Sequence, residues 1–100
     1  MRVIAWSTLV AFQKAHPETK ASLTRWYALT KAANWSSMDE LKAAFSSAVI
    51  LNAERARFEV AGGNYRLIAA YDFRRKIAFV KFIGTHAEYD RIDALTVSQF

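Results

Sequence analysis

Hydrophobic positions in the first half of the chain recur with a helical period. Within residues 15–35 they fall at intervals of three and four: Leu23, Trp26, Tyr27 and Thr30. This spacing places them on one face of a helix. Pro17 and Glu18 precede them and suit a first helical turn, because Pro lacks the amide hydrogen that would be unpaired there and Glu favours the positive end of the helix dipole. We therefore predict a helix that begins at Pro17.

Shorter elements are predicted on either side of this helix. Residues 2–5 form a short apolar run that predicts a strand. Ser7 stands where it would cap a short helix over the apolar residues that follow it. Ser37 and Glu40 have the spacing of a capping box ahead of another helical pattern. The first half of the chain is thus predicted to form one strand and two or three helices.

The second half is rich in aromatic and β-branched residues and carries two turn signals. One lies at Gly62–Gly63 and the other near Arg74–Arg75. Three antiparallel strands are predicted around these turns, at about residues 55–60, 64–72 and 77–83.

The positions of the turns set a register. Four cross-strand pairs follow from it: Val60 with Tyr65, Phe58 with Leu67, Leu67 with Phe82, and Ala69 with Val80. Because side chains alternate across a strand, one face collects apolar residues: Phe58, Val60, Tyr65, Leu67, Ala69, Tyr71, Ala78, Val80 and Phe82. The other face is mixed: Arg57, Glu59, Arg66, Ile68, Ala70, Phe79, Lys81 and Ile83. The apolar face must pack on the helices, which predicts an α+β fold with a mostly antiparallel sheet.

Composition narrows the class of protein. A chain of 100 residues with 53% hydrophobic residues is expected to form one domain, residues 1–100, with a packed core. Cysteine is absent and the two histidines lie about seventy residues apart, so neither a disulfide framework nor a metal centre is expected. No apolar run approaches the roughly 18 to 20 residues of a membrane span. We interpret the N-terminus as the first structural element rather than a signal peptide, and expect the cytoplasm as the compartment.

Positive charge is concentrated in one part of the chain. The formal net charge is +5, and residues 55–81 hold seven basic and two acidic groups. Localised positive charge favours a polyanionic partner, and nucleic acid is the first candidate. A solvated basic edge without a ligand is an equally good explanation of charge alone.

The segment GTHAEYDR, residues 84–91, combines a helix start with acid–base groups. Thr85 and Glu88 have capping-box spacing, which makes Thr85 the N-cap of a short helix. His86 and Tyr89 then share one helix face. Such a helix start offers free N–H groups to an anion, and the strand that bears Lys81 ends just before it.

Arginine, lysine, histidine and tyrosine around such a helix start suit the cleavage of RNA without a metal. A base removes the 2′-hydroxyl proton, the oxygen attacks the adjacent phosphate, and an acid protonates the leaving 5′-oxygen. Imidazole fits the acid–base role because its ordinary pKa is about 6.5. The guanidinium group offers a bidentate fork to phosphate oxygens.

Each residue also has a plain structural explanation. A lone histidine near a helix start is more often a surface residue than a catalyst. Tyr89 by itself is more often part of a core, and Lys81 by itself is usually a solvated strand end. The tryptophans are most simply packing residues. Spacing alone therefore does not decide the role of His86.

The chain resembles the HigB-type toxins of bacterial toxin–antitoxin systems. The most specific part is GTHAEYDRID. The segment FEVAGGNYRL is similar to the strand, turn and strand of that family, WYALTKAANWSSMDELKAAF to its helix and LK-x-x-F segment, and TLVAFQKAHPE to its N-terminal helix. The resemblance covers nearly the whole chain.

This resemblance implies a RelE-like fold and an mRNA interferase that acts on messenger RNA at the ribosome. It implies a helix-turn-helix antitoxin of the HigA type as partner, with operator DNA reached only through that antitoxin, and no cofactor or membrane partner. It carries catalytic roles to four residues: Arg66, Lys81, His86 and Tyr89. The expected RNA contacts are Arg57, Asn64, Arg74, Arg75, Lys76 and Arg91. Glu59 departs from the asparagine expected in relatives, and it either holds Arg66 in place or partly neutralises it.

Three hypotheses remain open at this point. The first is an endoribonuclease that uses His86, Tyr89, Arg66 and Lys81. The second is a noncatalytic RNA- or ribosome-binding module that needs the basic face but not His86. The third is a protein-interaction domain with incidental charge, which would have no affinity for nucleic acid.

Overall fold

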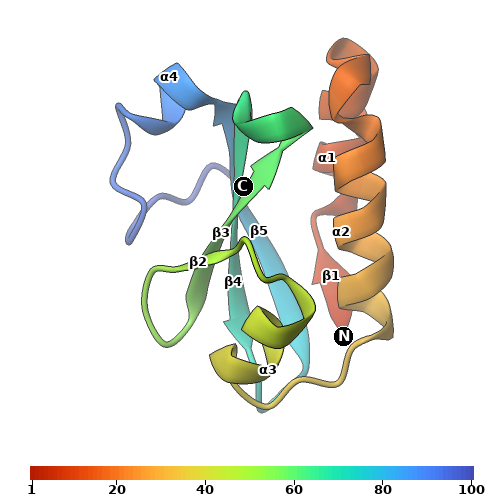
Figure 1. Ribbon diagram of the computed structural model, residues 1–100, viewed down its shortest axis with the longest axis vertical. Coiled ribbons are helices and arrows are strands. Elements are labelled where there is room, and N and C mark those ends of the chain that lie inside the picture. Colours follow the sequence, from red (N-terminus) through yellow and green to blue (C-terminus); the bar gives the residue numbers. More distant parts are fainter.

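The structure, a computed structural model, describes residues 1–100 and has a five-stranded sheet with three helices packed on one face and a short fourth helix at one end (Figure 1). The helices are α1 (Trp6–Ala15), α2 (Lys20–Ala32), α3 (Met38–Ala44) and α4 (His86–Tyr89), with two 3₁₀ turns, η1 (Pro17–Thr19) and η2 (Ala61–Gly63). The strands are β1 (Arg2–Ile4), β2 (Val49–Ile50), β3 (Arg55–Val60), β4 (Tyr65–Asp72) and β5 (Ile77–Thr85). The predicted α+β class is confirmed.

The sheet is mostly antiparallel, and its strand order is β1-β5-β4-β3-β2. Strands β3, β4 and β5 form the predicted meander, while β1 lies parallel to β5 at one edge. Strand β2, which the sequence pattern did not reveal, pairs with β3 at the other edge. The β4–β5 hairpin and α4 lie at opposite ends of the sheet because β5 runs from one to the other (Figure 1).

The predicted register holds between β3 and β4 and fails partway along β5. Val60 faces Tyr65 and Phe58 faces Leu67, as predicted. Ala69 faces Val80, but the register then shifts, so Leu67 faces Ile83 rather than Phe82. The shift is a bulge in which Lys81 is the extra residue, and a bulge exchanges the faces of every side chain beyond it. Ile83 therefore joins the helix-side core, and Phe82 lies on the second face, beside Ile68.

Three predicted helix starts differ from the structure in detail. Ser7 lies inside α1; the N-cap is Ala5, which has a φ of 72°. Ser37 is the N-cap of α3, but its side chain makes no capping bond, and Glu40 accepts a hydrogen bond from the Ser36 amide instead. Pro17 begins a 3₁₀ turn, and the α-helix proper starts at Lys20.

The core lies between the helices and the sheet. Fully buried leucines from three helices, Leu9, Leu23 and Leu41, meet the apolar face of the meander. Edge-to-face contacts join Trp26 and Phe45 to Phe58, with ring centres 6.0 Å and 5.0 Å apart. Burial of this apolar area holds the helices on the sheet.

The second face of the sheet, which bears Arg57, Ile68, Phe79 and Phe82, carries the C-terminal segment, residues 93–100. The Arg55 guanidinium donates to the carbonyls of Val97 (2.8 Å) and Ala94 (3.2 Å). Gln99 bonds β5 twice: its amide donates to the Lys81 carbonyl, and its side-chain oxygen accepts from the Ile83 amide, both at 2.9 Å. The two Gln99 bonds tie the segment to the bulge residue and to the strand just beyond it.

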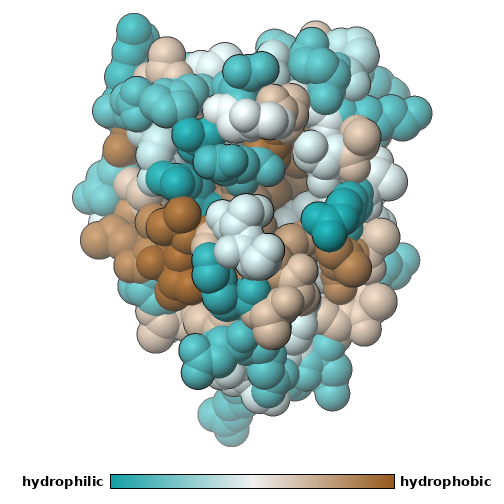
Figure 2. Space-filling view, viewed as in Figure 1, coloured by the Kyte–Doolittle hydropathy of each residue, from teal (hydrophilic) through white to brown (hydrophobic).

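The face seen in Figure 2 mixes polar and apolar residues, with an apolar patch over β2. Val49 and Ile50 are the exposed residues of that edge strand, at 39% and 37% of full accessibility. None of the helices has the length and apolar character needed to cross a membrane. Nowhere do three or more histidine or acidic side chains gather as a metal-binding group would.

Candidate active site

The short helix within the GTHAEYDR segment, α4, has the predicted capping box. The Thr85 hydroxyl accepts from the Glu88 amide at 3.1 Å, and the Glu88 carboxylate accepts from the Thr85 amide at 2.8 Å. The bond from the Thr85 amide lowers the pKa of Glu88, and the charges of His16 and Arg91 lower it further. The box fixes the direction in which α4 leaves β5.

Two N–H groups of this helix start are already bonded within the protein, so fewer are free for an anion than the sequence predicts. The His86 amide donates to the Asn64 carbonyl at 3.0 Å, and the Glu88 amide is bonded to Thr85. The bond from His86 to Asn64 ties the helix to the loop before β4.

His86 is exposed, and a carboxylate orients its ring. Nδ1 lies 3.1 Å from Oδ2 of Asp90, one helical turn further on. A carboxylate at Nδ1 fixes the tautomer of an imidazole and leaves Nε2 available for proton transfer. The sequence interpretation did not single out Asp90, although its spacing of four residues from His86 is the signal that would have found it.

Tyr89 lies against Arg57 and Phe82 on the second face of the sheet. The Arg57 guanidinium carbon is 5.3 Å from the centre of the Tyr89 ring, and its Nη1 lies 3.5 Å from the Tyr89 hydroxyl. The Phe82 ring is 6.3 Å away. Phe82 reaches this place only because of the bulge, so the sequence prediction assigned it to the wrong face.

Arg66 is almost fully buried, with 8% of its surface exposed. Its Nη1 donates to the Gly63 carbonyl, and it faces Glu59 across the β3–β4 pair as predicted. Nε atoms of both Arg66 and Arg57 are buried and bond no protein group. An unpaired buried donor costs about 1–3 kcal/mol, and a phosphate oxygen is an acceptor suited to such donors.

Gly84 leaves room for the groups around it. It faces Arg66 across the β4–β5 pair. A Cβ at this position would lie 2.7 Å from Cζ of Phe82 and 3.2 Å from Oε1 of Glu88. The absence of a side chain at Gly84 therefore allows Phe82 and the capping box to pack together.

Five of the predicted site residues make no hydrogen bond, ion pair or ring contact with Arg57, Arg66, His86 or Tyr89. The Lys81 amine lies 5.5 Å from the centre of the Phe79 ring, toward the hairpin end of β5. Arg74 and Arg75 lie at the hairpin, at the far end of the sheet from His86. Lys76 donates to the Trp35 carbonyl (2.8 Å) and the Ser36 hydroxyl (3.1 Å), which is a structural contact. Arg91 is exposed beyond α4 and acts electrostatically on Glu88.

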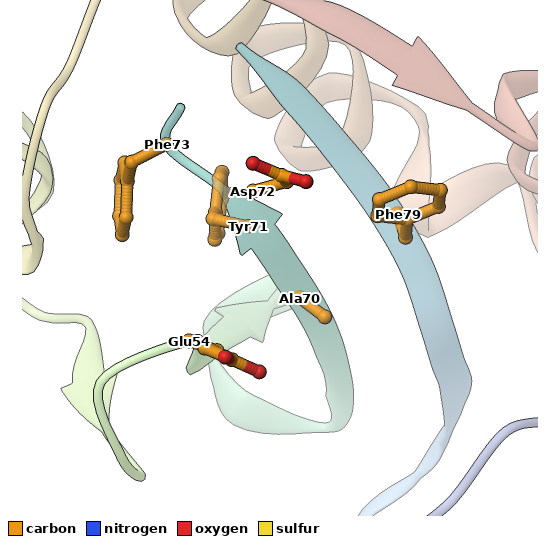
Figure 3. A pocket seen from close by; sticks show the side chains of 6 residues that line it. All are labelled: Glu54, Ala70, Tyr71, Asp72, Phe73 and Phe79. Atoms are coloured by element: carbon orange, nitrogen blue, oxygen red, sulfur yellow. The ribbon is translucent and has the colours of Figure 1, made fainter. Parts of the chain in front are cut away.

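The largest hollow in the surface does not coincide with the site. Its volume is about 410 Å³, and its lining comes from the hairpin half of the sheet: Glu54, Ala70, Tyr71, Asp72, Phe73 and Phe79 (Figure 3). None of the predicted site residues lines it. The residues around α4 instead form an exposed surface at the other end of the sheet, which suits an extended ligand better than a small molecule.

Comparison with known proteins places this site within a family. A family described as HigB toxin, the RelE-like toxic component of a toxin–antitoxin system, matches residues 19–92. The chain is also similar to the mRNA interferase HigB of Escherichia coli O6:H1, with 29% identity over 94 residues that span 92% of this chain and 91% of the relative. The family match contains β3, β4, β5 and α4. It therefore includes Arg57, Arg66, His86 and Tyr89. The chain belongs to the HigB toxin family of RelE-like toxic components of toxin–antitoxin systems.

Proposed function

We propose that this toxin is an endoribonuclease that cleaves messenger RNA. The observation that carries the proposal is the convergence of Arg57, Arg66, His86 and Tyr89 at the α4 end of the sheet, within the family-matched segment. The similarity to a protein named mRNA interferase supports the same activity.

The reaction requires two proton transfers and charge stabilisation. A base takes the proton of a 2′-hydroxyl, and that oxygen bonds to the adjacent phosphorus. The bond from phosphorus to the 5′-oxygen breaks, and an acid protonates that oxygen. The products are a 2′,3′-cyclic phosphate and a 5′-hydroxyl, and solvent restores both groups to their starting protonation. No metal ion is required for these steps.

The site offers groups for each role. The His86 side chain is 55% exposed, and the contact of Nδ1 with the Asp90 carboxylate leaves Nε2 for proton transfer. Arg57 and Arg66 are the cations closest to α4 on the sheet, and they would stabilise the phosphate. The Tyr89 ring, held by Arg57, offers a stacking surface to an unpaired base or a hydroxyl to the phosphate. Lys81 and Asn64 would add contacts to the bound RNA.

The partners follow from the proposed activity. We propose that the toxin acts in the cytoplasm on mRNA in the translating ribosome. A HigA-type helix-turn-helix antitoxin would neutralise it, and operator DNA would be reached only through that antitoxin. The basic residues of the hairpin, Arg74 and Arg75, lie far from His86 and would contact the backbone of ribosomal RNA.

Expression without an antitoxin tests the proposal. The wild-type chain should arrest growth and produce cut transcripts, whereas His86→Ala, Tyr89→Ala and Arg66→Ala should do so weakly. Arg66 is buried, so its variant needs a measurement of thermal unfolding beside it. Arg57→Ala provides a further probe of the phosphate contact. The site assignment is wrong if all of these variants are as toxic as the wild type.

Purified protein separates catalysis from binding. Cleavage of free RNA that survives a chelator would support a metal-independent enzyme, and cleavage only of ribosome-bound mRNA would establish ribosome dependence. Tight, salt-sensitive binding without cleavage would instead favour a noncatalytic RNA- or ribosome-binding module. That alternative predicts that His86→Ala inhibits translation as strongly as the wild type.

A further inference from the structure

The second histidine of the chain also lies in a group of acid–base side chains. Nδ1 of His16, at the end of α1, is 3.3 Å from the Tyr65 hydroxyl and 3.8 Å from Oε1 of Glu18. The Tyr65 hydroxyl donates to the same Glu18 oxygen at 3.1 Å. The Phe12 ring stacks on the imidazole, with centres 4.3 Å apart. Three contacts therefore hold a ring that keeps 38% of its side chain exposed.

This group lies at the same end of the sheet as α4. Tyr65 begins β4 and faces Thr85, the N-cap of α4. The preceding residue, Asn64, accepts the hydrogen bond from the His86 amide. Two consecutive residues thus contact the two histidines, one through a side chain and the other through its backbone. The charge of His16 also acts on Glu88, the carboxylate of the capping box.

The two imidazoles are held through the same ring nitrogen, one directly by a carboxylate and the other through a hydroxyl. Nδ1 of His86 lies 3.1 Å from the Asp90 carboxylate, whereas Nδ1 of His16 contacts the Tyr65 hydroxyl, which in turn donates to Glu18. Nε2 of each ring bonds no protein group, and each ring is partly exposed. A carboxylate at Nδ1 with a free Nε2 is the arrangement that makes imidazole an effective acid or base.

The two histidines belong to elements that meet this end of the sheet differently. His16 and Tyr65 belong to the helix side, where Phe12 and Tyr65 pack on the core. His86 begins the helix whose Tyr89 lies on the second face. In an in-line displacement at phosphorus, the attacking and leaving oxygens stand on opposite sides of the phosphate. A pair of proton-transfer groups on opposite sides of an RNA strand suits that geometry.

We propose that His16 is the second proton-transfer residue of RNA cleavage, opposite His86, with Glu18 and Tyr65 as its positioning residues. The assignment rests on the proposed endoribonuclease activity. One imidazole accepts the proton of the 2′-hydroxyl and the other donates a proton to the leaving 5′-oxygen. His16 and Glu18 lie before the family-matched residues 19–92, so the family match assigns them no role.

The titratable groups that face His16 come from three elements. They are Glu18 of η1, Tyr65 of β4 and Glu88 of α4. Burial raises the pKa of Tyr65, and its bond to Glu18 raises it further, so the hydroxyl keeps its proton across the range in which imidazole titrates.

The test is the pH profile of mRNA cleavage by wild type, His16→Gln and His86→Gln. Single-turnover rates on ribosome-bound mRNA would be measured between about pH 5.5 and 8.5, the range in which imidazole changes charge. The wild type should give a bell-shaped profile. Each single variant should lose one limb and about 10²–10⁴-fold in rate, with unchanged affinity for the RNA. Tyr65→Phe, which keeps the ring and removes the hydroxyl, should cause a smaller loss in rate.

The controls distinguish failure of the His16 assignment from failure of the proposed endoribonuclease activity. Thermal unfolding of His16→Gln near that of the wild type, together with the loss of one limb, supports the proposal. A His16→Gln variant that keeps both limbs and a rate within a few-fold of wild type overturns it. A loss of cleavage rate that is equal at every pH and accompanied by unfolding also overturns it, because that result gives His16 a structural role. A wild-type chain that binds RNA without cutting it refutes the proposed function itself.

Discussion

Gly84 shows how tightly single residues are packed around α4. The position lies between the Phe82 ring and the Glu88 carboxylate, and it faces the buried Arg66. Phe82 in turn lies beside Tyr89, which contacts Arg57. A side chain at Gly84 would therefore displace several groups of the candidate site together.

The Gly84→Ala substitution should lower both stability and RNA cleavage. The added methyl group would lie 2.7 Å from Cζ of Phe82, so the ring, which packs beside Tyr89, must move. Overpacking of this kind costs typically about 1–3 kcal/mol, measurable by denaturant unfolding. Gly62→Ala is the matched control, because nothing lies within 4 Å of its Cβ and only its φ of +68° is strained. Equal cleavage by the two variants would show that Phe82 does not position Tyr89.

Local signals made some site residues predictable. Thr85 and Glu88 were identified correctly because a capping box is set by a spacing of three residues. The position of Lys81 was not predictable in the same way. Its environment depends on a bulge, and the bulge is stabilised by Gln99, which is distant in sequence. Tyr65 was not predictable as a partner of His16 for a related reason, since it is 49 residues away.

At the scale of elements, α4 is a helix of four residues that relies on its cap. A helix this short has little intrinsic stability. The two bonds of the capping box and the bond from His86 to the Asn64 carbonyl replace the missing helical bonds. Loss of the cap should therefore affect the whole of α4 together with its His86 and Tyr89.

Acid should weaken this cap through Glu88. Folding lowers the pKa of Glu88 below its ordinary value of 4.5, so the cap contributes fully above that value and its contribution is lost as the pH falls through the folded pKa. Glu88→Gln keeps the capping geometry but removes the charge. Its unfolding free energy should fall less than that of the wild type between about pH 5 and pH 3.

Two comparisons complete the pH experiment. Thr85→Ala removes the hydroxyl cap and should cost about 1 kcal/mol at neutral pH. Glu54→Gln, at an exposed position outside the cap, should follow the wild-type acid dependence. If the unfolding free energies of wild type and Glu88→Gln fell equally as the pH is lowered, that result would contradict the role of the charged cap.

The C-terminal segment should protect the bulge of β5 from solvent exchange. The Gln99 side chain accepts from the Ile83 amide at 2.9 Å. Gln99→Ala removes that acceptor, so hydrogen exchange of the Ile83 amide should become faster while that of Leu67, in the central strand, stays unchanged. Ser98→Ala is the control, because its hydroxyl bonds only within the segment. Unchanged exchange at Ile83 would mean that the segment does not hold the bulge.

At the scale of the whole molecule, positive charge is divided between two ends of the sheet. Arg57 and Arg66 lie near α4, while Arg74 and Arg75 lie at the hairpin. The sequence showed that residues 55–81 are basic, but charge along a chain does not state which end of a strand each residue occupies. The fold class was predictable because the apolar faces of the meander and the helices were clear. The parallel pairing of β1 was not, because it joins distant parts of the chain.

This division predicts different effects of the two groups of cations. Arg74→Ala together with Arg75→Ala should weaken association with ribosomes and reduce the salt dependence of binding. The slope of log Kd against log salt should fall by about 0.7–0.9 for each lost phosphate contact. The cleavage rate at saturation should not change. Lys31→Ala, an exposed cation on α2, is the control. An unchanged slope would exclude the hairpin from the interface.

The parallel pairing of β1 with β5 bears on the order in which the protein folds. Arg2 pairs with Ile77, whereas β3, β4 and β5 follow one another along the chain. Closing a long loop costs more entropy than forming a hairpin, so the meander should form first and β1 should join late. Folding φ-values should then be high for Leu67→Ala and low for Val3→Ala; the reverse order would refute this sequence of events. The surroundings of His86 would be assembled before the helical layer brings His16 to the same end of the sheet.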